Sequence, residues 1–243
     1  MMAIDTVIFD LDGTLLNTLE DLADAVNYAL RTHHLPTHTY EEVRLMVGNG
    51  VRNLVLRGAG LQRLASAGPD DVVWEEVAPE EAPVTPERFE EIFATFRAYY
   101  VDHCQVKTRL YDGMEELLLI LRARGCRMAI VSNKLQAGVT ELQHQYFDGM
   151  IDVAIGEREG IPRKPDPRMV EAALSALCRE GESTDDVRAR AVYVGDSDVD
   201  ILTAQRAGMP CVSVLWGFRD ESFLRQHGAT CFASQPKDIL DYL

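Results

Sequence analysis

Four places in the chain set charged or reactive side chains at or shortly after the end of an apolar run. They are Asp10 with Asp12 after "TVIF", Ser132 with Asn133 after "MAIV", Lys164 in "RKPDP", and Asp196 after "VYVG". In an open parallel sheet, ligands bind at the carboxyl ends of the strands. These carboxylates, the hydroxyl and the ammonium can therefore converge on one anionic reacting group.

The spacing of Asp10 and Asp12 suits two carboxylates that bracket one group. In an extended segment their side chains point the same way and lie about 6.6 Å apart, at roughly 3.3 Å per residue. Gly13 lets the backbone turn sharply after Asp12. Two carboxylates facing a phosphate repel it, by roughly 4 kcal/mol per pair of unit charges 4 Å apart at an effective dielectric constant of about 20. A cation is therefore needed. Mg²⁺ suits a site built only from oxygen ligands, here one or two carboxylates with substrate oxygen and water.

The other strand ends supply the remaining parts of such a site. We expect Asp196 to be a further acidic ligand of the metal, and Lys164 to hold both the phosphate and the first aspartate. Ser132 and the backbone N–H groups after it would bind phosphate oxygens at a helix start. If a helix begins at "GDSDVD", Asp200 shares a face with Asp196 and lies behind the ligands, while Asp198 points to solvent.

Each of these residues also has an ordinary structural explanation. An aspartate at a strand end commonly caps a helix, and serine and asparagine favour turns. The acidic residues of "GDSDVD" favour a helix N-terminus through its dipole without any metal. Lys164 among three prolines could be a solvated loop lysine. The combination of all four places favours a site.

Elements that could position these residues alternate along the chain. Buried strands are predicted for Thr6–Phe9, Met128–Val131, Val153–Ile155, Val192–Val194 and Val212–Leu215, because each is a continuous apolar run. Helical patterns follow at Met114–Arg124, Met169–Arg179 and Ile201–Ala207. The alternation predicts an α/β fold, a doubly wound, Rossmann-like parallel sheet with helices on both sides.

Residues 18–101 break this alternation. They carry four helical patterns and no β-rich run: Leu19–Thr32, Tyr40–Val47, Val51–Arg57 and Glu87–Tyr100. We predict a helical cap domain inserted into a core formed by residues 1–17 and 102–243, with the two crossings as paired hinges. The Pro-rich "APEEAPVTP" at 78–86 is expected to be a surface loop between helices.

Composition limits the function classes. The 243 residues are 47% hydrophobic, and the net charge of −15 argues against partners such as nucleic acid or an anionic membrane surface. A small anion in a local cationic pocket remains possible. Five cysteines at least 20 residues apart favour reduced thiols. Without an apolar leader or spanning segment, the expected compartment is the cytoplasm. Oligomeric state stays open.

The motifs beginning at Asp10, Ser132, Lys164 and Gly195 resemble, in order, the four signature motifs of the haloacid dehalogenase superfamily. The resemblance implies that Asp10 is a nucleophile forming an aspartyl-phosphate. It also implies that Asp12 is the acid for the leaving alcohol and then the base for water. Mg²⁺ would be bound by Asp10, the main-chain carbonyl of Asp12 and Asp196. An insertion after the first motif resembles the cap of one subfamily.

Within the superfamily, "LEDLADAVNYAL", "EEVRLMVGNGVR" and "TRLYDGM" resemble phosphoglycolate phosphatases. The resemblance implies a cap loop at 47–50 in which Gly48 permits close approach and Asn49 bonds a small leaving group. A plain turn between two helices is nearly as good an explanation. Arg52 could meet a substrate carboxylate, although an exposed helix arginine is the default.

Other function classes remain open. A sugar phosphomutase, or a phosphatase for another small ester, would use the same nucleophile. Dehalogenation is disfavoured because it needs neither Asp12 nor Asp196. A non-catalytic binding module on the same fold is disfavoured by the complete motif set. The chain lacks GxGxxG after the first strand and lacks GxxxxGK[ST], so dinucleotide and P-loop nucleotide binding are not favoured.

Overall fold

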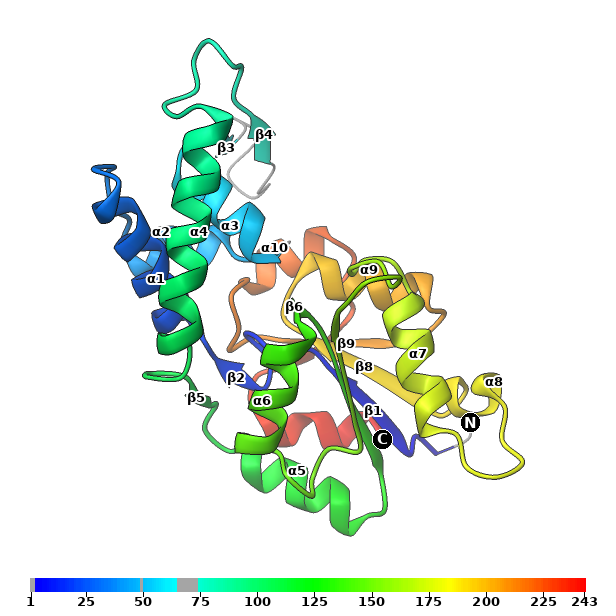
Figure 1. Ribbon diagram of the computed structural model, residues 1–243. Helices are drawn as coiled ribbons and strands as arrows, with labels where there is room; N and C mark the ends of the chain where they lie inside the picture. Colours follow the sequence, from blue (N-terminus) through cyan, green and yellow to red (C-terminus); the bar gives the residue numbers. More distant parts are fainter. Residues whose placement is uncertain (1–2, 49, 65–73) are drawn as a thin grey trace. The chain divides into compact units, whose positions relative to one another are not determined.

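The computed structural model describes residues 3–48, 50–64 and 74–243. The chain divides into two compact units (Figure 1). One unit, Met1–Leu16 with Leu110–Leu243, is called the sheet unit here. The other, Asn17–Arg109, is called the helical unit. Among the described residues, no helix is long and apolar enough to cross a membrane.

A six-stranded sheet forms the centre of the sheet unit, in the order β10-β9-β8-β1-β6-β7. The strands are β1 (Thr6–Phe9), β6 (Arg127–Leu135), β7 (Val153–Glu157), β8 (Ala191–Gly195), β9 (Cys211–Val214) and β10 (Cys231–Ala233). Every ladder between them is parallel. The predicted α/β fold is confirmed, and β10 is a strand that the sequence patterns did not indicate.

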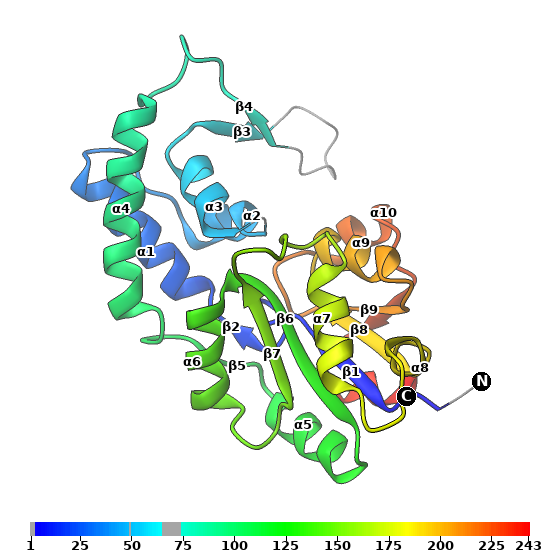
Figure 2. The same cartoon turned by 45° about the vertical axis from the view of Figure 1, so that its right-hand side comes forward.

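Helices cover both faces of this sheet (Figure 1, Figure 2). They are α5 (Met114–Ala123), α6 (Gln136–Tyr146), α7 (Arg168–Leu177), α8 (Thr184–Arg188), α9 (Asp198–Arg206), α10 (Glu221–Gln226) and the 3-10 helix η1 (Pro236–Tyr242). Val7 and Phe9 pack with α5, α6 and η1, whereas Ile8 packs with α7, α8 and α9. Successive side chains alternate between two apolar layers, which explains the unbroken apolar run of β1.

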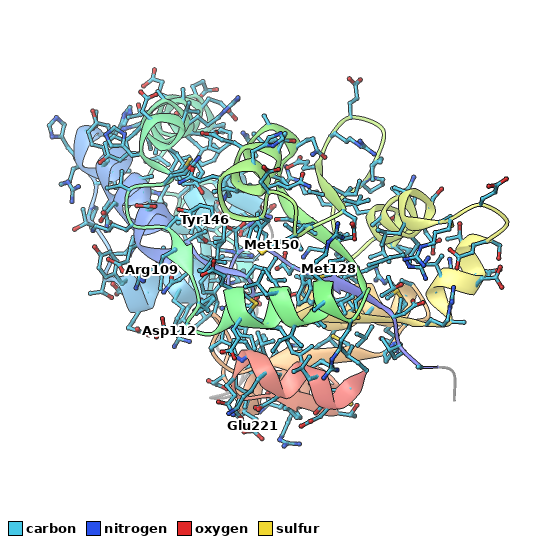
Figure 3. All side chains as sticks on the ribbon, turned by 90° about the horizontal axis from the view of Figure 1, so that it is seen from below. Arg109, Asp112, Met128, Tyr146, Met150 and Glu221 are labelled. Atoms are coloured by element: carbon cyan, nitrogen blue, oxygen red, sulfur yellow. The ribbon has the colours of Figure 1, made fainter. Side chains whose placement is uncertain are left out.

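The apolar layer that contains α5 and α6 is seen from below in Figure 3. Met128 on β6 belongs to it, and Tyr146 and Met150 pack against it (Figure 3). Leu118 and Leu121 of α5 are fully buried in the same layer. This packing fixes β6, the strand that carries the second sequence motif.

The helical unit contains α1 (Leu19–Thr32), α2 (Tyr40–Met46), α3 (Gly50–Gly58) and α4 (Pro86–His103). The helix α1 packs along α4 around an apolar core (Figure 1). Thr39 caps α2 with a capping box, and Thr85 caps α4 with Pro86 at its first turn. Two short strands, β2 (Leu16–Asn17) and β5 (Arg109–Leu110), form a separate two-stranded sheet.

The helical unit also contains an antiparallel pair, β3 (Gln62–Leu64) and β4 (Trp74–Glu76). The amino-acid pattern predicts no strand here. Three of the six residues, Arg63, Glu75 and Glu76, are polar and exposed, and no β-branched run marks the two strands. Pairing of the two backbones, which composition does not report, defines these strands.

Asp21 fastens the two ends of the helical unit together. Its buried carboxylate, in the first turn of α1, accepts hydrogen bonds from the backbone N–H groups of Lys107 (3.0 Å) and Thr108 (2.8 Å). The Lys107 ammonium lies 2.7 Å from Asp24 on the same helix. The point where the chain enters this unit therefore lies next to the point where it leaves.

Candidate functional site

The central strands bring the motif residues to one edge of the sheet. Strand β1 lies between β6 and β8, and all three run parallel. Asp10 directly follows β1 and Asp196 directly follows β8, while Ser132 lies near the end of β6. The backbone N–H of Asp10 donates to the Val194 carbonyl (2.9 Å), which continues the ladder up to the site.

Three carboxylates meet at this edge. Asp10, Asp196 and Asp200 are buried, and one oxygen of each lies within 4.8 Å of the others. A set of three buried carboxylates offers only oxygen ligands and excess negative charge, which is the donor set that hard divalent cations take. The cluster therefore fits a metal ion. Asp200, expected behind the ligands, contributes one of the three converging oxygens.

Lys164 supplies a cation inside this cluster. Its ammonium lies 2.8 Å from Oδ1 of Asp10, 2.8 Å from Oδ1 of Asp200 and 3.2 Å from the hydroxyl of Tyr193. That hydroxyl also donates to Asp200 Oδ1 (3.1 Å). Burial favours loss of the proton from Lys164, but the charges of Asp10 and Asp200 outweigh it and raise the pKa of Lys164 well above its usual value. Lys164 therefore carries its charge.

Asn133 holds the backbone of Lys164. The side-chain oxygen of Asn133 accepts the Lys164 N–H (2.8 Å), and the side-chain nitrogen donates to the Lys164 carbonyl (3.2 Å). The amide thus pairs with both polar groups of one residue, as a neighbouring strand would. Its neighbour Ser132 is buried, and the Ser132 hydroxyl accepts the N–H of Lys134 (3.1 Å).

Asp12 is not part of the three-carboxylate cluster and has a different ionic partner. Its carboxylate forms an ion pair with the ammonium of Lys134 at 3.1 Å. About a fifth of the Asp12 side chain is exposed, 19%, against 8% for Lys134. The two aspartates after β1 thus have different cationic partners, Lys164 for Asp10 and Lys134 for Asp12.

The cluster carboxylates lie directly against backbone. A Cβ at Gly217 would lie 2.2 Å from the Cβ of Asp196, and a Cβ at Gly195 would lie 2.3 Å from the Cγ of Asp200. Gly13, with φ of +88°, has the same relation to Asp196. Only glycine fits at these places, because any side chain would collide with a carboxylate.

Hydrogen bonds orient Asp196 and Asp200. Asp196 accepts the N–H of Phe218 (2.7 Å) and the hydroxyl of Thr14 (3.3 Å). Asp200 forms a capping box with Ser197, so α9 begins at Asp198 and Asp196 precedes the helix. The two carboxylates meet because the turn at Ser197 folds back. Asp198 is half-buried and does not belong to the cluster.

Burial and mutual repulsion dominate the electrostatics. Burial, followed by the charge of Asp200, raises the pKa of Asp10 well above its usual value. The same two causes raise the pKa of Asp196 to about 7, although the N–H of Phe218 acts in the opposite direction. Proton uptake relieves repulsion among clustered carboxylates, and so does a bound cation.

The helical unit holds the other predicted site residues. Gly48 has φ of +144° and its carbonyl accepts the N–H of Gly50 (2.9 Å), whereas Asn49 lies outside the described residues. Arg52 forms an ion pair with Glu90 and lies over the rings of two phenylalanines on α4. Its guanidinium is thus engaged within the helical unit.

The sequence patterns missed three neighbours of the site. Tyr193 reads as one more core residue of β8, and Gly217 has no sequence signal beyond its type. Lys134 follows Ser132 and Asn133 directly, so its place in the motif was the one signal that could have indicated it.

Known proteins resemble this chain over most of its length. The family model described as haloacid dehalogenase-like hydrolase matches residues 7–214. The phosphoglycolate phosphatase of Caulobacter vibrioides is 34% identical over 221 residues, covering 89% of this chain and 81% of the relative. The phosphoglycolate phosphatase of Cereibacter sphaeroides is 32% identical over 237 residues, with 96% of each chain covered.

Solved structures resemble the whole chain. A Lactobacillus delbrueckii subsp. bulgaricus protein, described as a putative phosphoglycolate phosphatase, matches with a TM-score of 0.87 at 35% identity, covering 99% of this chain and 98% of that chain. A Haemophilus somnus protein, described as a predicted phosphoglycolate phosphatase, matches with a TM-score of 0.81 at 26% identity and covers 100% of this chain and 99% of that one.

Proposed function

Because the chain belongs to the haloacid dehalogenase-like hydrolase family and is a phosphatase, we propose that it hydrolyses 2-phosphoglycolate to glycolate and phosphate through an aspartyl-phosphate. The observation that carries the proposal is Asp10 itself. It is buried, lies in a cluster of carboxylates and contacts the Lys164 ammonium at 2.8 Å. In this proposal, Asp10 is the nucleophile and the Lys164 ammonium beside it attracts the phosphate, while a bound cation offsets the neighbouring carboxylates.

In the first half of the proposed reaction, an oxygen of Asp10 attacks phosphorus. The bond between phosphorus and the ester oxygen breaks, and Asp12 donates a proton to the departing alkoxide. In the second half, Asp12 accepts a proton from water. The hydroxide oxygen attacks phosphorus, the bond to Asp10 breaks, and phosphate leaves. One carboxylate thus serves as acid and then as base.

The other side chains bind and orient the phosphoryl group. Lys164 offers its ammonium to a phosphate oxygen beside Asp10, and the Ser132 hydroxyl with the backbone N–H of Asn133 serves a second oxygen. Asn133 keeps Lys164 in place through the backbone of that lysine. Asp10, Asp196 and the main-chain carbonyl of Asp12 would hold Mg²⁺, with Asp200 beside them. When bound, the ion offsets the repulsion between carboxylates and phosphate.

The substrate proposal is supported by the curated relatives, which are named phosphoglycolate phosphatases. The VGNG loop of the helical unit, with Gly48 and Asn49, is the proposed contact for the small leaving group. A short polar acid needs a close backbone approach rather than a large pocket, which glycine permits. The proposed location of this activity is the cytoplasm.

A phosphate-release assay tests the proposal. The purified protein is offered a panel of small phosphate esters that includes 2-phosphoglycolate, with Mg²⁺ or with EDTA. We expect release from 2-phosphoglycolate to be the fastest and to need the metal. Equal rates in EDTA would reject the metal, and retained turnover in Asp10→Asn would reject the nucleophile. An isomerised sugar phosphate without free phosphate would identify a mutase instead.

A further inference from the structure

Lys134 is not among the proposed phosphate ligands, but it forms an ion pair with Asp12. The Lys134 ammonium lies 3.1 Å from Oδ1 of Asp12, and only 8% of the lysine side chain is exposed. A solvated surface pair contributes little because water and salt screen it. A largely covered lysine, in contrast, gives its carboxylate partner a defined place and orientation.

The structure holds Lys134 in position through its backbone. Strand β6 has an irregularity between Val131 and Leu135, and the Lys134 N–H within it donates to the Ser132 hydroxyl. The next strand approaches closely at Gly156, where a Cβ would lie 2.8 Å from the Lys134 carbonyl. The side chain of Gln136 bonds the backbone of β7 at the same place. The lysine thus projects from a fixed bulge.

The stem of Lys134 is supported as well. A Cβ at Gly138, on α6, would lie 3.6 Å from each of three stem carbons, which is ordinary contact. The stem therefore runs along the start of α6 and delivers its ammonium to Asp12. The long side chain has much rotamer freedom to lose, and the helix surface limits that freedom before any substrate arrives.

We propose that Lys134 is a positioning residue that holds the carboxylate of Asp12 for proton transfer. This inference rests on the proposed function of Asp12 as acid and base. An aspartate side chain has three staggered rotamers about its first torsion, and only an orientation facing the ester oxygen can deliver a proton. Without Lys134, the partly exposed Asp12 distributes among these orientations. A misplacement of about 1 Å can cost roughly 100-fold in rate.

The leaving group of the ester separates this role from others. A 2-phosphoglycolate alkoxide needs a proton as it departs, whereas p-nitrophenolate leaves without one. The ratio kcat/KM reports the steps up to the breaking of the ester bond. We expect Lys134→Met to lower kcat/KM about 10- to 100-fold for 2-phosphoglycolate and to leave kcat/KM for p-nitrophenyl phosphate within about 3-fold. Lys134→Arg should recover part of the loss.

Two further comparisons complete the experiment. Lys237→Met, at an exposed lysine, serves as the matched control and should leave both ratios unchanged. A double-mutant cycle uses Asp12→Asn: if Lys134 acts through Asp12, adding Lys134→Met to that variant should cost no more than about 2-fold. Thermal midpoints of all variants show which of them are folded.

The outcomes are distinct. An equal fall of kcat/KM for both esters would overturn the positioning role and indicate that Lys134 binds the phosphate. Additive losses in the double variant would overturn it too. If Asp12→Asn strongly lowers kcat/KM for 2-phosphoglycolate while Lys134→Met leaves it unchanged, the inference fails and the proposed function stands. If Asp12→Asn is fully active, the proposed acid and base role fails, and the inference fails with it.

Discussion

Lys164 and Asp200 form an ion pair that is closed to solvent. The ammonium lies 2.8 Å from Oδ1 of Asp200, and their side chains are 3% and 0% exposed. Asp200 also accepts hydrogen bonds from Tyr193 and from Ser197. The lysine is thus fixed on one side by Asp200 while the same ammonium contacts Asp10 on the other. A buried charge of this kind is tolerated only while its partners are present.

Replacing Lys164 by methionine should therefore destabilise the protein. It removes the ammonium from among three buried carboxylates, and breaking a buried pair typically costs about 3–5 kcal/mol. The loss should be smaller near pH 5 than near pH 8, because the raised pKa values of Asp10 and Asp196 allow both to take up protons. Urea unfolding of the metal-free protein at the two pH values measures this loss of unfolding free energy, with Lys237→Met as the control. A loss below about 1 kcal/mol at pH 8 would contradict this account.

Metal binding should be linked to pH through Asp196. Its pKa is about 7 in the folded chain, against about 3.9 when unfolded. Between these values the folded state binds more protons than the unfolded state, so the stability of the metal-free protein falls as pH rises from about 4 to 7. A cation replaces those protons. Mg²⁺ should therefore raise the thermal midpoint more at pH 8 than at pH 5, and equal shifts would contradict the assignment.

Gly217→Ala should disturb the cluster without changing a charge. The new methyl group would lie 2.2 Å from the Asp196 Cβ and 2.6 Å from the Gly13 carbonyl, so carboxylate or backbone must move. Overpacking of this kind costs about 1–3 kcal/mol of folding free energy. If the displaced carboxylate loses about 1.4 kcal/mol of Mg²⁺ binding free energy, the ion binds about 10-fold more weakly, and we expect a loss of at least this size. Calorimetric titration measures the affinity.

Gly138→Ala is the matched control for Gly217→Ala. Gly138 lies on α6, and the nearest side-chain atoms to its new methyl group would be carbons of the Lys134 stem at 3.6 Å, an ordinary contact. Alanine in a helix is favoured over glycine by up to about 1 kcal/mol, so stability should hold or rise, with Mg²⁺ affinity unchanged. Equal effects of the two substitutions would show that the close approach at Gly217 has no special role.

Glu182, at the amino end of the sheet, should stabilise the fold in a pH-dependent way through its hydrogen bonds and ion pairs. The N–H of Arg179 and then the guanidinium of Arg190 lower the pKa of Glu182 to about 2. The stabilisation is present above the unfolded value of about 4.3 and is lost as pH falls toward 2. Glu182→Gln should therefore be less stable than the parent at pH 7 and equal to it near pH 2. Glu180→Gln, at an exposed position, should show no such trend in acid unfolding.

The fold was predictable because burial on both faces leaves a strong trace in the sequence. "TVIF" and "AVYVG" have no polar side chain that could face water apart from Thr6 and Tyr193, so both had to be internal strands of a covered sheet. Once β1 and β8 were strands, Asp10 and Asp196 had to follow them at the same edge. The local pattern thus places both residues at one edge, and they converge because β1 and β8 are neighbours in the sheet.

Other parts of the site depend on pairings that no local pattern encodes. Lys164 reaches the cluster because Asn133, 31 positions earlier, binds its backbone. Lys134 meets Asp12 because a bulge in β6 aims it there. Tyr193 looked like packing and is also a hydrogen-bond donor to Asp200. The first two contacts join segments distant in the chain, and the third joins β8 to α9 across a turn, so only the assembled fold reports them.

The hydrogen bonds of Asp21 make the helical unit an insert that could be exchanged as a whole. Because the carboxylate binds the N–H groups of Lys107 and Thr108, the segment Asn17–Arg109 starts and finishes at neighbouring points. Segments with adjacent ends can be grafted or exchanged without stretching their host. A chimera that carries a foreign insert here should fold with its sheet intact, and substrate choice could then evolve by wholesale replacement while the phosphoryl chemistry is inherited unchanged.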